Sequence, residues 1–366
     1  MQIKIERFMR LALELAKKAR GETFPNPLVG AVIVKNNKVM GKGFHQKAGG
    51  LHAEIFALRQ AGSGAKGATL YCTLEPCAHF GRTGPCVEEI IKAGIQEVCI
   101  GMVDPNPLAK GRGIQQLRKA GVRVHVGFLK EEISSLNEAF VKAMTKGLPF
   151  VTIKIAESLD GKIATSNSES QWITGEQSRD HAHRIRRFYD AIMVGLHTVL
   201  KDNPRLESFP ETDHRLTKII IDSKLVLPLS ARLFKTKQPV IIAAVKRNKA
   251  KEKRLKRKGA SIFYTRPKES RVRLKELLKE LNRLEIRSIL VEGGAELIGS
   301  FLDQKLADKA LVFIAPKIIG GRRALSSVGG EGVRRLSQAI CLENESYRKI
   351  GKDILIEGYL KYAPKG

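Results

Sequence analysis

Long apolar runs are missing from this sequence. No stretch among its 366 residues approaches the roughly 20 consecutive apolar residues that a helix needs to cross a bilayer. Residues 1–20 carry apolar side chains at helical spacing, but they lack the continuous apolar segment and small-residue cleavage site of a signal peptide. We therefore expect a cytoplasmic protein that does not bind a membrane.

Cysteines and aromatic residues are also few. Five cysteines are an odd number in a chain without an export signal, which argues against a disulfide framework and favours metal or catalytic use of some of them. Aromatic residues make up 6% of the chain. This low content argues against a surface that binds single-stranded nucleic acid by stacking its bases.

Acidic residues are outnumbered by basic ones. The chain has 65 Lys and Arg against 37 Asp and Glu, a formal net charge of +28. Such a charge suits anionic partners, either phosphorylated small molecules or nucleic acid. A solvated basic surface is the other interpretation, because the charge is dispersed along the chain. The densest basic run, residues 246–258, is predicted to form one exposed helix face.

The chain is longer than one hydrophobic core usually supports, so two domains are expected. A helix predicted over residues 131–145 is followed by Lys-Gly-Leu-Pro at 146–149, and glycine closely followed by proline is a helix-stop signal. We place the boundary there, with one domain over residues 1–146 and another over residues 147–366. Strands alternate with helices in both, which predicts two α/β domains.

Hydrophobic periodicity gives the expected elements. In the first domain these are helices over residues 6–19, 52–61, 85–93 and 113–120 and strands over residues 28–34, 39–44, 68–73, 97–103 and 123–126. In the second they are helices over residues 176–188, 271–283 and 295–302 and strands over residues 151–155, 191–194, 218–222, 239–245, 261–264, 288–291, 309–314 and 354–360.

Four residues of the first domain form a candidate metal site. His52 and Glu54 begin a predicted helix, and Cys77 and Cys86 each follow a proline. One imidazole and two thiolates suit tetrahedral zinc, and three protein ligands leave a fourth position for water, as a hydrolytic site requires. Glu54 need not bind the metal and can transfer protons. The pattern matches the His-x-Glu…Pro-Cys signature of zinc deaminases, which act on an amino-bearing ring carbon.

Other roles for the cysteines stay open at this point. A closed zinc site that also uses Cys72 would be structural rather than catalytic. Cys72 and Cys99 both lie in apolar strand sequences, however, and we expect them to be small buried core residues.

The segment between the two ligand cysteines identifies a family. Residues 76–86 (Pro-Cys-Ala-His-Phe-Gly-Arg-Thr-Gly-Pro-Cys) resemble the deaminase half of the bifunctional riboflavin-biosynthesis deaminase/reductases. Residues 26–30, 41–45 and 104–107 are similar to further motifs of that family, and the resemblance covers essentially the whole chain. It implies a cytidine-deaminase-like three-layer domain followed by a dihydrofolate-reductase-like α/β domain.

The resemblance also implies a set of substrate-binding residues in the deaminase domain. Asn and Asp side chains can read the donors and acceptors of a pyrimidinone edge, histidines can reach ring or ribose groups, and arginine can bind a phosphate. Each polar residue could instead be an ordinary turn or cap residue, and Asn106, between two prolines, is the most turn-like. The implied residues are Asn26, His45, His79, Arg82, Asp104 and Asn106.

Four segments of the second domain resemble the reductase: residues 154–164, 170–174, 195–204 and 291–295. The last of these, residues 291–295, runs from a predicted strand through two glycines into a predicted helix. The glycines let the backbone approach a diphosphate, whose negative charge is favoured at the N-terminus of the helix. The second domain lacks the Gly-x-Gly-x-x-Gly fingerprint of a Rossmann dehydrogenase. The resemblance implies that substrate contacts Lys154, Ser170, Arg186, Leu206 and Glu292, and that the cofactor contacts Ala156, Trp172, Thr198, Asp202, Ser223 and Gly294. Core packing is the alternative role for Trp172.

One position departs from the family pattern. The family usually has Leu-Thr-x-Arg at the site where this chain has Leu206 followed by Glu207-Ser208-Phe209, so the expected arginine is missing. Arg205 or Arg215 could take its place.

The resemblance implies two consecutive steps of riboflavin synthesis. Zinc-dependent hydrolysis removes the C2 amine of 2,5-diamino-6-(ribosylamino)pyrimidinone 5′-phosphate, and NADPH then reduces the ribosyl chain to ribityl. The expected partners are these phosphorylated pyrimidines, not nucleic acid, and the chain is expected to be a homo-oligomer (a dimer or tetramer). A nucleic-acid-editing zinc deaminase and a non-catalytic, zinc-stabilised binding module remain as alternatives.

Overall fold

The computed structural model describes residues 2–78, 84–208, 216–267 and 270–363. The chain folds into two compact units, Met1–Leu148 and Pro149–Gly366. In the described ranges, no helix combines the length and the apolar composition that crossing a membrane would require.

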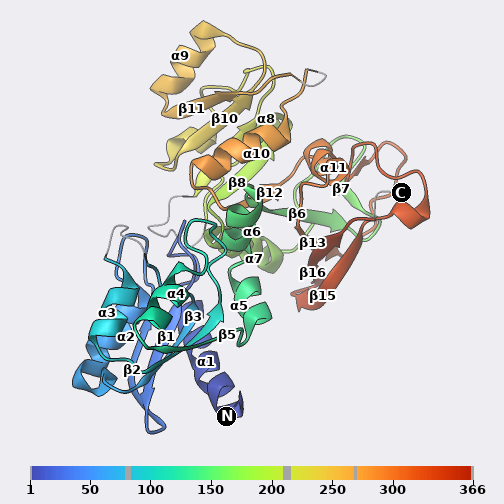
Figure 1. The fold of residues 1–366 in the computed structure, drawn as a ribbon. Helices are drawn as coiled ribbons and strands as arrows, with labels where there is room; N and C mark the ends of the chain where they lie inside the picture. The colour runs from blue at the N-terminus through green and yellow to red at the C-terminus, as the bar shows by residue number, and fades with distance from the viewer. Residues whose placement is uncertain (1, 79–83, 209–215, 268–269, 364–366) are drawn as a thin grey trace. The chain divides into compact units, whose positions relative to one another are not determined.

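Among its described residues, the first unit contains a five-stranded sheet in the order β2-β1-β3-β4-β5 (Figure 1). Strands β3, β4 and β5 are parallel, and β1 is antiparallel to both β2 and β3. The strands are β1 (Gly30–Lys35), β2 (Lys38–Phe44), β3 (Thr69–Leu74), β4 (Glu97–Met102) and β5 (Arg123–Val126). The helices are α1 (Gln2–Lys17), α2 (Ala53–Ala61), α3 (Cys86–Lys92), α4 (Arg112–Lys119), α5 (Lys130–Leu136) and α6 (Glu138–Lys146).

Helices α1 and α2 cover opposite faces of this sheet. A Cβ at Gly30 of β1 would lie 1.9 Å from the carbonyl oxygen of Ala12 in α1, whereas a Cβ at Gly43 of β2 would lie 2.2 Å from that of Ala53 in α2. Gly43 pairs with Ala31, the neighbour of Gly30, and successive residues of a strand face opposite sides. The first unit is therefore a helix–sheet–helix sandwich, which confirms the predicted three-layer, deaminase-like domain.

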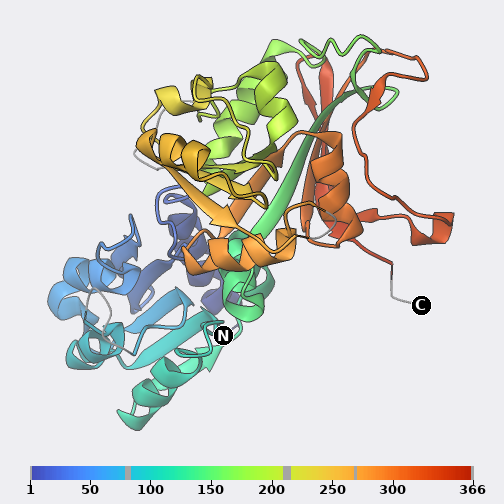
Figure 2. The same cartoon turned by 90° about the horizontal axis from the view of Figure 1, so that it is seen from above.

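In the described part of the second unit, nine strands form one sheet in the order β11-β10-β9-β8-β12-β6-β13-β16-β15. Neighbouring strands from β11 to β13 are parallel, and β16 and β15 add an antiparallel edge. Figure 2 shows the long green β6 alongside the red C-terminal strands. The strands are β6 (Phe150–Ser158), β8 (Ala191–Gly195), β9 (Thr217–Ile221), β10 (Val240–Ala244), β11 (Ala260–Tyr264), β12 (Ser288–Glu292), β13 (Lys309–Ala315), β15 (Cys341–Ile350) and β16 (Asp353–Lys361).

Helices of this unit connect the parallel strands, as such crossovers require. They are α7 (Glu176–Ile185), α8 (Leu196–Asp202), α9 (Lys249–Arg257), α10 (Leu274–Arg283) and α11 (Ala295–Asp303). A two-stranded sheet pairs β7 (Lys162–Ala164) with β14 (Leu325–Ser326). Only Leu255 of α9 is buried, which confirms that the basic run at residues 246–258 presents an exposed helix face.

The predicted elements are found with a few corrections. The single helix expected over residues 131–145 is wrong: Asn137, with φ −111° and ψ 23°, separates α5 from α6. Its buried side chain bonds the backbone of Leu28 at both the amide and the carbonyl, which holds the chain in this break. Helix α8 and edge strand β15 were not predicted; β15 is mostly exposed and polar, so it has little hydrophobic alternation.

Candidate functional site

The predicted metal ligands converge in the first unit. One ligand atom from each of His52, Cys77 and Cys86 lies within 4.8 Å of the others. His52 immediately precedes α2 and Cys86 opens α3, while Cys77 follows β3 in the connecting loop. Two helix N-termini therefore meet at the end of a strand, and such N-termini favour the thiolate form of cysteine.

The spacing of these atoms fits zinc. His52 Nδ1 lies 3.1 Å from Cys86 Sγ and 3.4 Å from Cys77 Sγ. Ligands at the usual Zn–N and Zn–S bond lengths, about 2.0–2.1 and 2.3 Å, lie about 3.6 Å apart at tetrahedral angles. Both nitrogen–sulfur distances are thus close to the required separation. Cys72 and Cys99 are fully buried in the core, as predicted, and all five cysteines are free.

Polar contacts within the ligand set favour a charged form of the site. The hydrogen bond from Cys86, with a further contribution from His52, holds the pKa of the Cys77 thiol well below its usual range. The hydrogen bond with Cys77 in turn raises the pKa of His52. The amide of Cys86 also donates to Cys77 Sγ at 3.3 Å. A thiolate is therefore available to a cation at near-neutral pH.

Glu54 lies in the first turn of α2, and its side chain is buried. Burial raises the pKa of Glu54 to about 7, although the nearby His52 opposes the shift. A carboxyl group with a pKa near the working pH can both accept and release a proton. Glu54 thus has the burial and the position of a general acid–base residue beside the ligand set.

His45, the next predicted site residue, immediately follows strand β2. Gly41 and Gly43 let α2 pack directly on β2, because a Cβ at either position would overlap the helix backbone. The His45 ring lies edge-on to His52, with 5.7 Å between ring centroids. This close strand–helix packing explains the glycines of the 41–45 motif.

His45 and Asn26 form a hydrogen-bonded pair. His45 Nδ1 lies 3.0 Å from the Leu51 carbonyl oxygen, so this nitrogen is the donor. Nε2 must then accept from Asn26 Nδ2, also at 3.0 Å. Burial lowers the pKa of His45, which is consistent with a neutral ring. The structure therefore brings two predicted substrate residues together.

Asp104 and Asn106 lie in the loop that follows β4. Asp104 Oδ1 accepts from the Asn106 amide at 2.8 Å, and Asn106 Oδ1 accepts from the Leu108 amide at 3.1 Å. Both side chains thus shape the turn as well as being predicted to contact substrate. His79 and Arg82 lie outside the described residues.

Two buried polar residues were not singled out by the sequence motifs. Glu75 accepts hydrogen bonds from the segment that carries Asp104, and Asn137 bonds the backbone of Leu28, two residues after Asn26. A signal for Glu75 was present, since a charged residue at the end of an apolar strand next to Pro76-Cys77 is unusual. Nothing in the sequence relates Asn137 to Leu28.

In the second unit, a buried ion-pair cluster joins three of the predicted substrate residues. Arg186 binds Glu292 through two hydrogen bonds, Nε to Oε1 at 2.7 Å and a terminal NH₂ group to Oε2 at 2.8 Å. Lys154 Nζ lies 3.3 Å from Glu292 Oε2. Burial opposes ionisation of Glu292, but the two cations outweigh it and lower the pKa of Glu292 to about 2.

Predicted cofactor residues lie at the carboxyl ends of neighbouring parallel strands. Gly293 and Gly294 follow β12 with φ of 102° and 79°, a backbone that favours glycine, and lead directly into α11. A Cβ at Gly293 would lie 3.4 Å from Thr198 Oγ1 in α8, the helix that follows β8. Asp202, at the end of α8, lies 3.4 Å from Ser170 Oγ. This edge can hold a dinucleotide, since ligands of open α/β sheets bind there.

Trp172 is 62% exposed, so the core-packing alternative is wrong. Its ring lies against the Arg179 guanidinium, whose carbon is 4.4 Å from the ring centroid. An exposed aromatic face beside the predicted substrate residue Ser170 is available to a flat ring such as nicotinamide.

The remaining predicted reductase residues occupy varied surroundings. Ala156 packs beside the core of the unit, and the Ser223 carbonyl accepts from the amides of Val245 and Lys246. The Leu206 side chain is buried in the core, which leaves its main chain for any substrate contact. Arg205 is about half exposed and pairs with Glu207 at 3.6 Å, whereas Arg215 lies outside the described residues.

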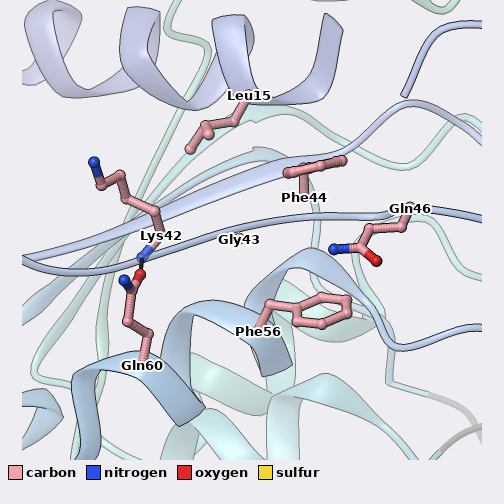
Figure 3. A pocket seen from close by; sticks show the side chains of 7 residues that line it. All are labelled: Leu15, Lys42, Gly43, Phe44, Gln46, Phe56 and Gln60. Atoms are coloured by element: carbon pink, nitrogen blue, oxygen red, sulfur yellow. Dashed lines mark hydrogen bonds between the residues drawn. The ribbon is translucent and has the colours of Figure 1, made fainter. Parts of the chain in front are cut away.

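A small pocket of about 260 Å³ lies between α1, β2 and α2 (Figure 3). At one end the Lys42 amide donates to Gln60 Oε1 at 2.6 Å. The predicted metal ligands and substrate residues are not among those that line it, which are Leu15, Lys42, Gly43, Phe44, Gln46, Phe56 and Gln60.

Family models match both units. The model of the cytidine and deoxycytidylate deaminase zinc-binding region matches residues 2–102, and the RibD C-terminal domain model matches residues 149–356.

Relatives match over nearly the full length. Riboflavin biosynthesis protein RibD of Aquifex aeolicus (strain VF5) is 45% identical over 350 residues, 95% of this chain and 96% of that protein. The RibD protein of Escherichia coli (strain K12) is 36% identical over 370 residues, 96% of this chain and 98% of that protein.

Solved structures are similar over the same extent. Acinetobacter baumannii RibD (form 2) superimposes with a TM-score of 0.88 at 35% identity, covering 98% of this chain and 99% of that one. A diaminohydroxyphosphoribosylaminopyrimidine deaminase/5-amino-6-(5-phosphoribosylamino)uracil reductase from Thermotoga maritima gives a TM-score of 0.84 at 36% identity, with the same coverage.

Proposed function

The chain belongs to the RibD family of bifunctional deaminase/reductases of riboflavin biosynthesis, and from that premise we propose the substrates of its two units and the roles of their residues. It is an enzyme with a hydrolytic deaminase domain and an NADP-linked reductase domain. The proposal assigns the first reaction to Met1–Leu148 and the second to Pro149–Gly366.

In the first unit the proposed substrate is 2,5-diamino-6-(ribosylamino)pyrimidinone 5′-phosphate, which loses its C2 amine as ammonia. His52, Cys77 and Cys86 would hold the zinc ion. When bound, zinc supplies a Lewis acid that makes water a nucleophile near neutral pH. Glu54 takes a proton from the water and delivers it to the ring and the leaving amine, a role that its burial and its pKa near 7 support.

Polar residues around Glu54 would orient the pyrimidine. Asn26, whose Nδ2 donates to the neutral His45, would present its remaining N–H and its side-chain oxygen to the base, and Asp104 and Asn106 would contribute from the loop that follows β4. We assign the ribose and phosphate to His79 and Arg82 from the resemblance alone.

In the second unit NADPH is the proposed cofactor, and when bound its nicotinamide supplies the hydride that reduces the ribosyl C1′ to a ribityl chain. Gly294 and the start of α11 would face its diphosphate, and Thr198, Asp202, Ser223 and Ala156 would contact the rest. The exposed ring of Trp172 would lie against the nicotinamide.

The reductase substrate would bind beside the ion-pair cluster. Lys154 and Arg186 carry two positive charges against the single carboxylate of Glu292, so the cluster keeps a net positive charge. A substrate phosphate can bind such a cluster, and we assign Ser170 and the main chain of Leu206 to the same substrate from the resemblance alone.

The observation that carries the proposal is the meeting of an open three-ligand set with the buried Glu54. The test supplies the diamino pyrimidinone phosphate with and without NADPH and follows ammonia and cofactor oxidation separately. We expect ammonia release without NADPH and oxidation once NADPH is added. Oxidation of NADPH without ammonia release would overturn the proposed order.

A matched variant tests the role of Glu54. Glu54→Gln should keep zinc and stop ammonia release, while the reductase still acts on the deaminated compound supplied from outside. If ammonia release is unchanged, the unit is a zinc-stabilised module in which Glu54 has no catalytic role. Sequence-selective binding of single-stranded oligonucleotides at physiological salt would instead favour the nucleic-acid-editing alternative.

A further inference from the structure

The Glu75 carboxylate accepts hydrogen bonds from four backbone N–H groups. Glu75 lies between β3 and Cys77 and is only 4% exposed. Its Oε2 accepts from the amides of Asp104 at 3.1 Å and Gly111 at 3.0 Å. Its Oε1 accepts from the amides of Gly113 at 2.9 Å and Ile114 at 3.2 Å. Each oxygen thus binds two donors, which uses the carboxylate in full.

All four donors belong to one segment, residues 104–114, which runs from the end of β4 into the first turn of α4. Glu75 Oε2 binds both Asp104 and Gly111, so a single atom closes the loop between them. Inside this loop, Asp104 and Asn106 shape the turn with their own side chains. Glu75 thus bonds both ends of the loop that carries two of the proposed substrate residues.

The same backbone holds a zinc ligand. Glu75 is two residues before Cys77, and its amide donates to the Met102 carbonyl at 2.9 Å, which fixes it beside the end of β4. On the other side, α4 approaches so closely that a Cβ at Gly113 would lie 2.1 Å from the Pro76 carbonyl oxygen. The substrate loop is thus attached directly to the segment that carries Cys77.

We propose that Glu75 is a positioning residue of the deaminase, which sets the 104–114 loop, and with it Asp104 and Asn106, relative to the zinc ligand Cys77. The inference rests on the proposed substrate role of Asp104 and Asn106. A carboxylate suits the task because charge-assisted bonds to backbone amides are stronger than neutral ones. An amide side chain of the same shape has one acceptor oxygen and would turn an NH₂ group towards two of the four N–H groups.

The test is Glu75→Gln in the full-length, zinc-loaded chain, with Glu97→Gln as the matched control. Glu97 also accepts polar contacts in this unit, from His125 and Arg123, but it begins β4, about 17 Å along the strand from the end that precedes Asp104. Zinc content, KM and kcat for ammonia release, and reductase activity on the deaminated compound are measured for each variant.

We expect Glu75→Gln to keep zinc and reductase activity and to lower deaminase kcat/KM by about 10–100-fold, mostly through KM, because a small displacement of binding groups has effects of this size. Glu97→Gln should stay within about threefold of wild type, as surface ion pairs contribute little. Equal effects of the two variants, or a Glu75→Gln loss that tracks zinc content, would overturn the proposal.

Two further variants keep the outcome decisive. If Glu75→Gln does not fold, Gly113→Ala displaces the loop from its other end and should raise KM in the same way with zinc retained; an unchanged KM would refute the inference. Asn106→Ala tests the premise. If it leaves KM unchanged, the proposed substrate assignment fails. If it raises KM while Glu75→Gln does not, the inference about Glu75 alone fails.

Discussion

Replacing Glu292 by glutamine should destabilise the second unit strongly. Glu292 is 7% exposed. Its carboxylate accepts two hydrogen bonds from the Arg186 guanidinium and forms an ion pair with the ammonium group of Lys154. Glutamine keeps the shape but removes the charge, so Lys154 and Arg186 lose the carboxylate that pairs with both of them. Breaking a buried pair by removing one partner costs about 3–5 kcal/mol.

The pKa of Glu292 gives a second value for the stability that its ionised carboxylate contributes. This pKa falls from 4.5 to about 2 in the folded protein. A tenfold change in an ionisation constant corresponds to about 1.4 kcal/mol, so the ionised carboxylate contributes about 3 kcal/mol to stability. Because the folded pKa is depressed, this contribution is complete above pH 4.5 and is lost as the pH falls towards 2. The usual cost of breaking a buried ion pair and the depressed pKa of Glu292 therefore predict about the same loss of stability.

Urea unfolding of the substrate-free chain, followed by tryptophan fluorescence, measures this effect. Trp172 is the only tryptophan in the sequence, so the signal reports on the second unit alone. With an m-value of about 2–3 kcal/mol per molar urea, a loss of about 3 kcal/mol lowers the midpoint by roughly 1 M. The Glu292→Gln variant should also lose the wild-type decline in stability below pH 4.5.

The control is Glu343→Gln, which removes an exposed partner of Lys361 in the same unit. Such surface pairs contribute little, so its midpoint should remain near that of wild type. If Glu292→Gln unfolds at the same urea concentration as this control, the ion-pair cluster does not stabilise the unit, and the argument from burial and charge is wrong.

Three other substitutions test the site and the core. Cys86→Ser should lower zinc content and ammonia release together, while NADPH oxidation with the deaminated compound stays unchanged; zinc analysis and the two assays check this. Gly294→Ala, at φ 79°, should weaken NADPH binding about tenfold by calorimetry, whereas Gly259→Ala, at φ 84° with open space around it, should not. Burial lowers the pKa of Lys218 from 10.5 to about 8. Between these pH values the folded state binds fewer protons than the unfolded state, so the free energy of unfolding should rise with pH. Lys218→Met should abolish this rise, and unfolding measurements across the pH range check it.

The convergence of His52, Cys77 and Cys86 could be predicted from the sequence because local structure fixes much of their relation. His52 and Glu54 lie at the start of one helix, and Cys86 opens another. The N-terminus of a helix is marked in the sequence by the residues that precede it, and the metal requires a defined donor set. The parallel strands were predicted for a similar reason, since buried strands between helices are short apolar runs.

The parts that were missed depend on contacts between distant segments. Asn137 interrupts a helical pattern because its amide group pairs with the backbone of Leu28, 109 positions away. Glu75 is an unusual charge beside an apolar strand, but the sequence does not show that its partners are the amides of residues 104–114. A buried polar side chain costs free energy unless its partners are present, and those partners are main-chain groups that carry no sequence signal.

Arg186 and Glu292 show that assigning a role to each residue separately overlooks the pairing between residues. Each was predicted to bind substrate, yet the structure pairs them with one another and adds a bond from Arg186 to the Glu207 carbonyl. Three of the five N–H groups of the guanidinium are thus used, so a substrate phosphate would share Arg186 with Glu292 instead of displacing it. The missing family arginine after Leu206 then matters less, because Lys154 leaves the cluster with the positive charge that a phosphate needs.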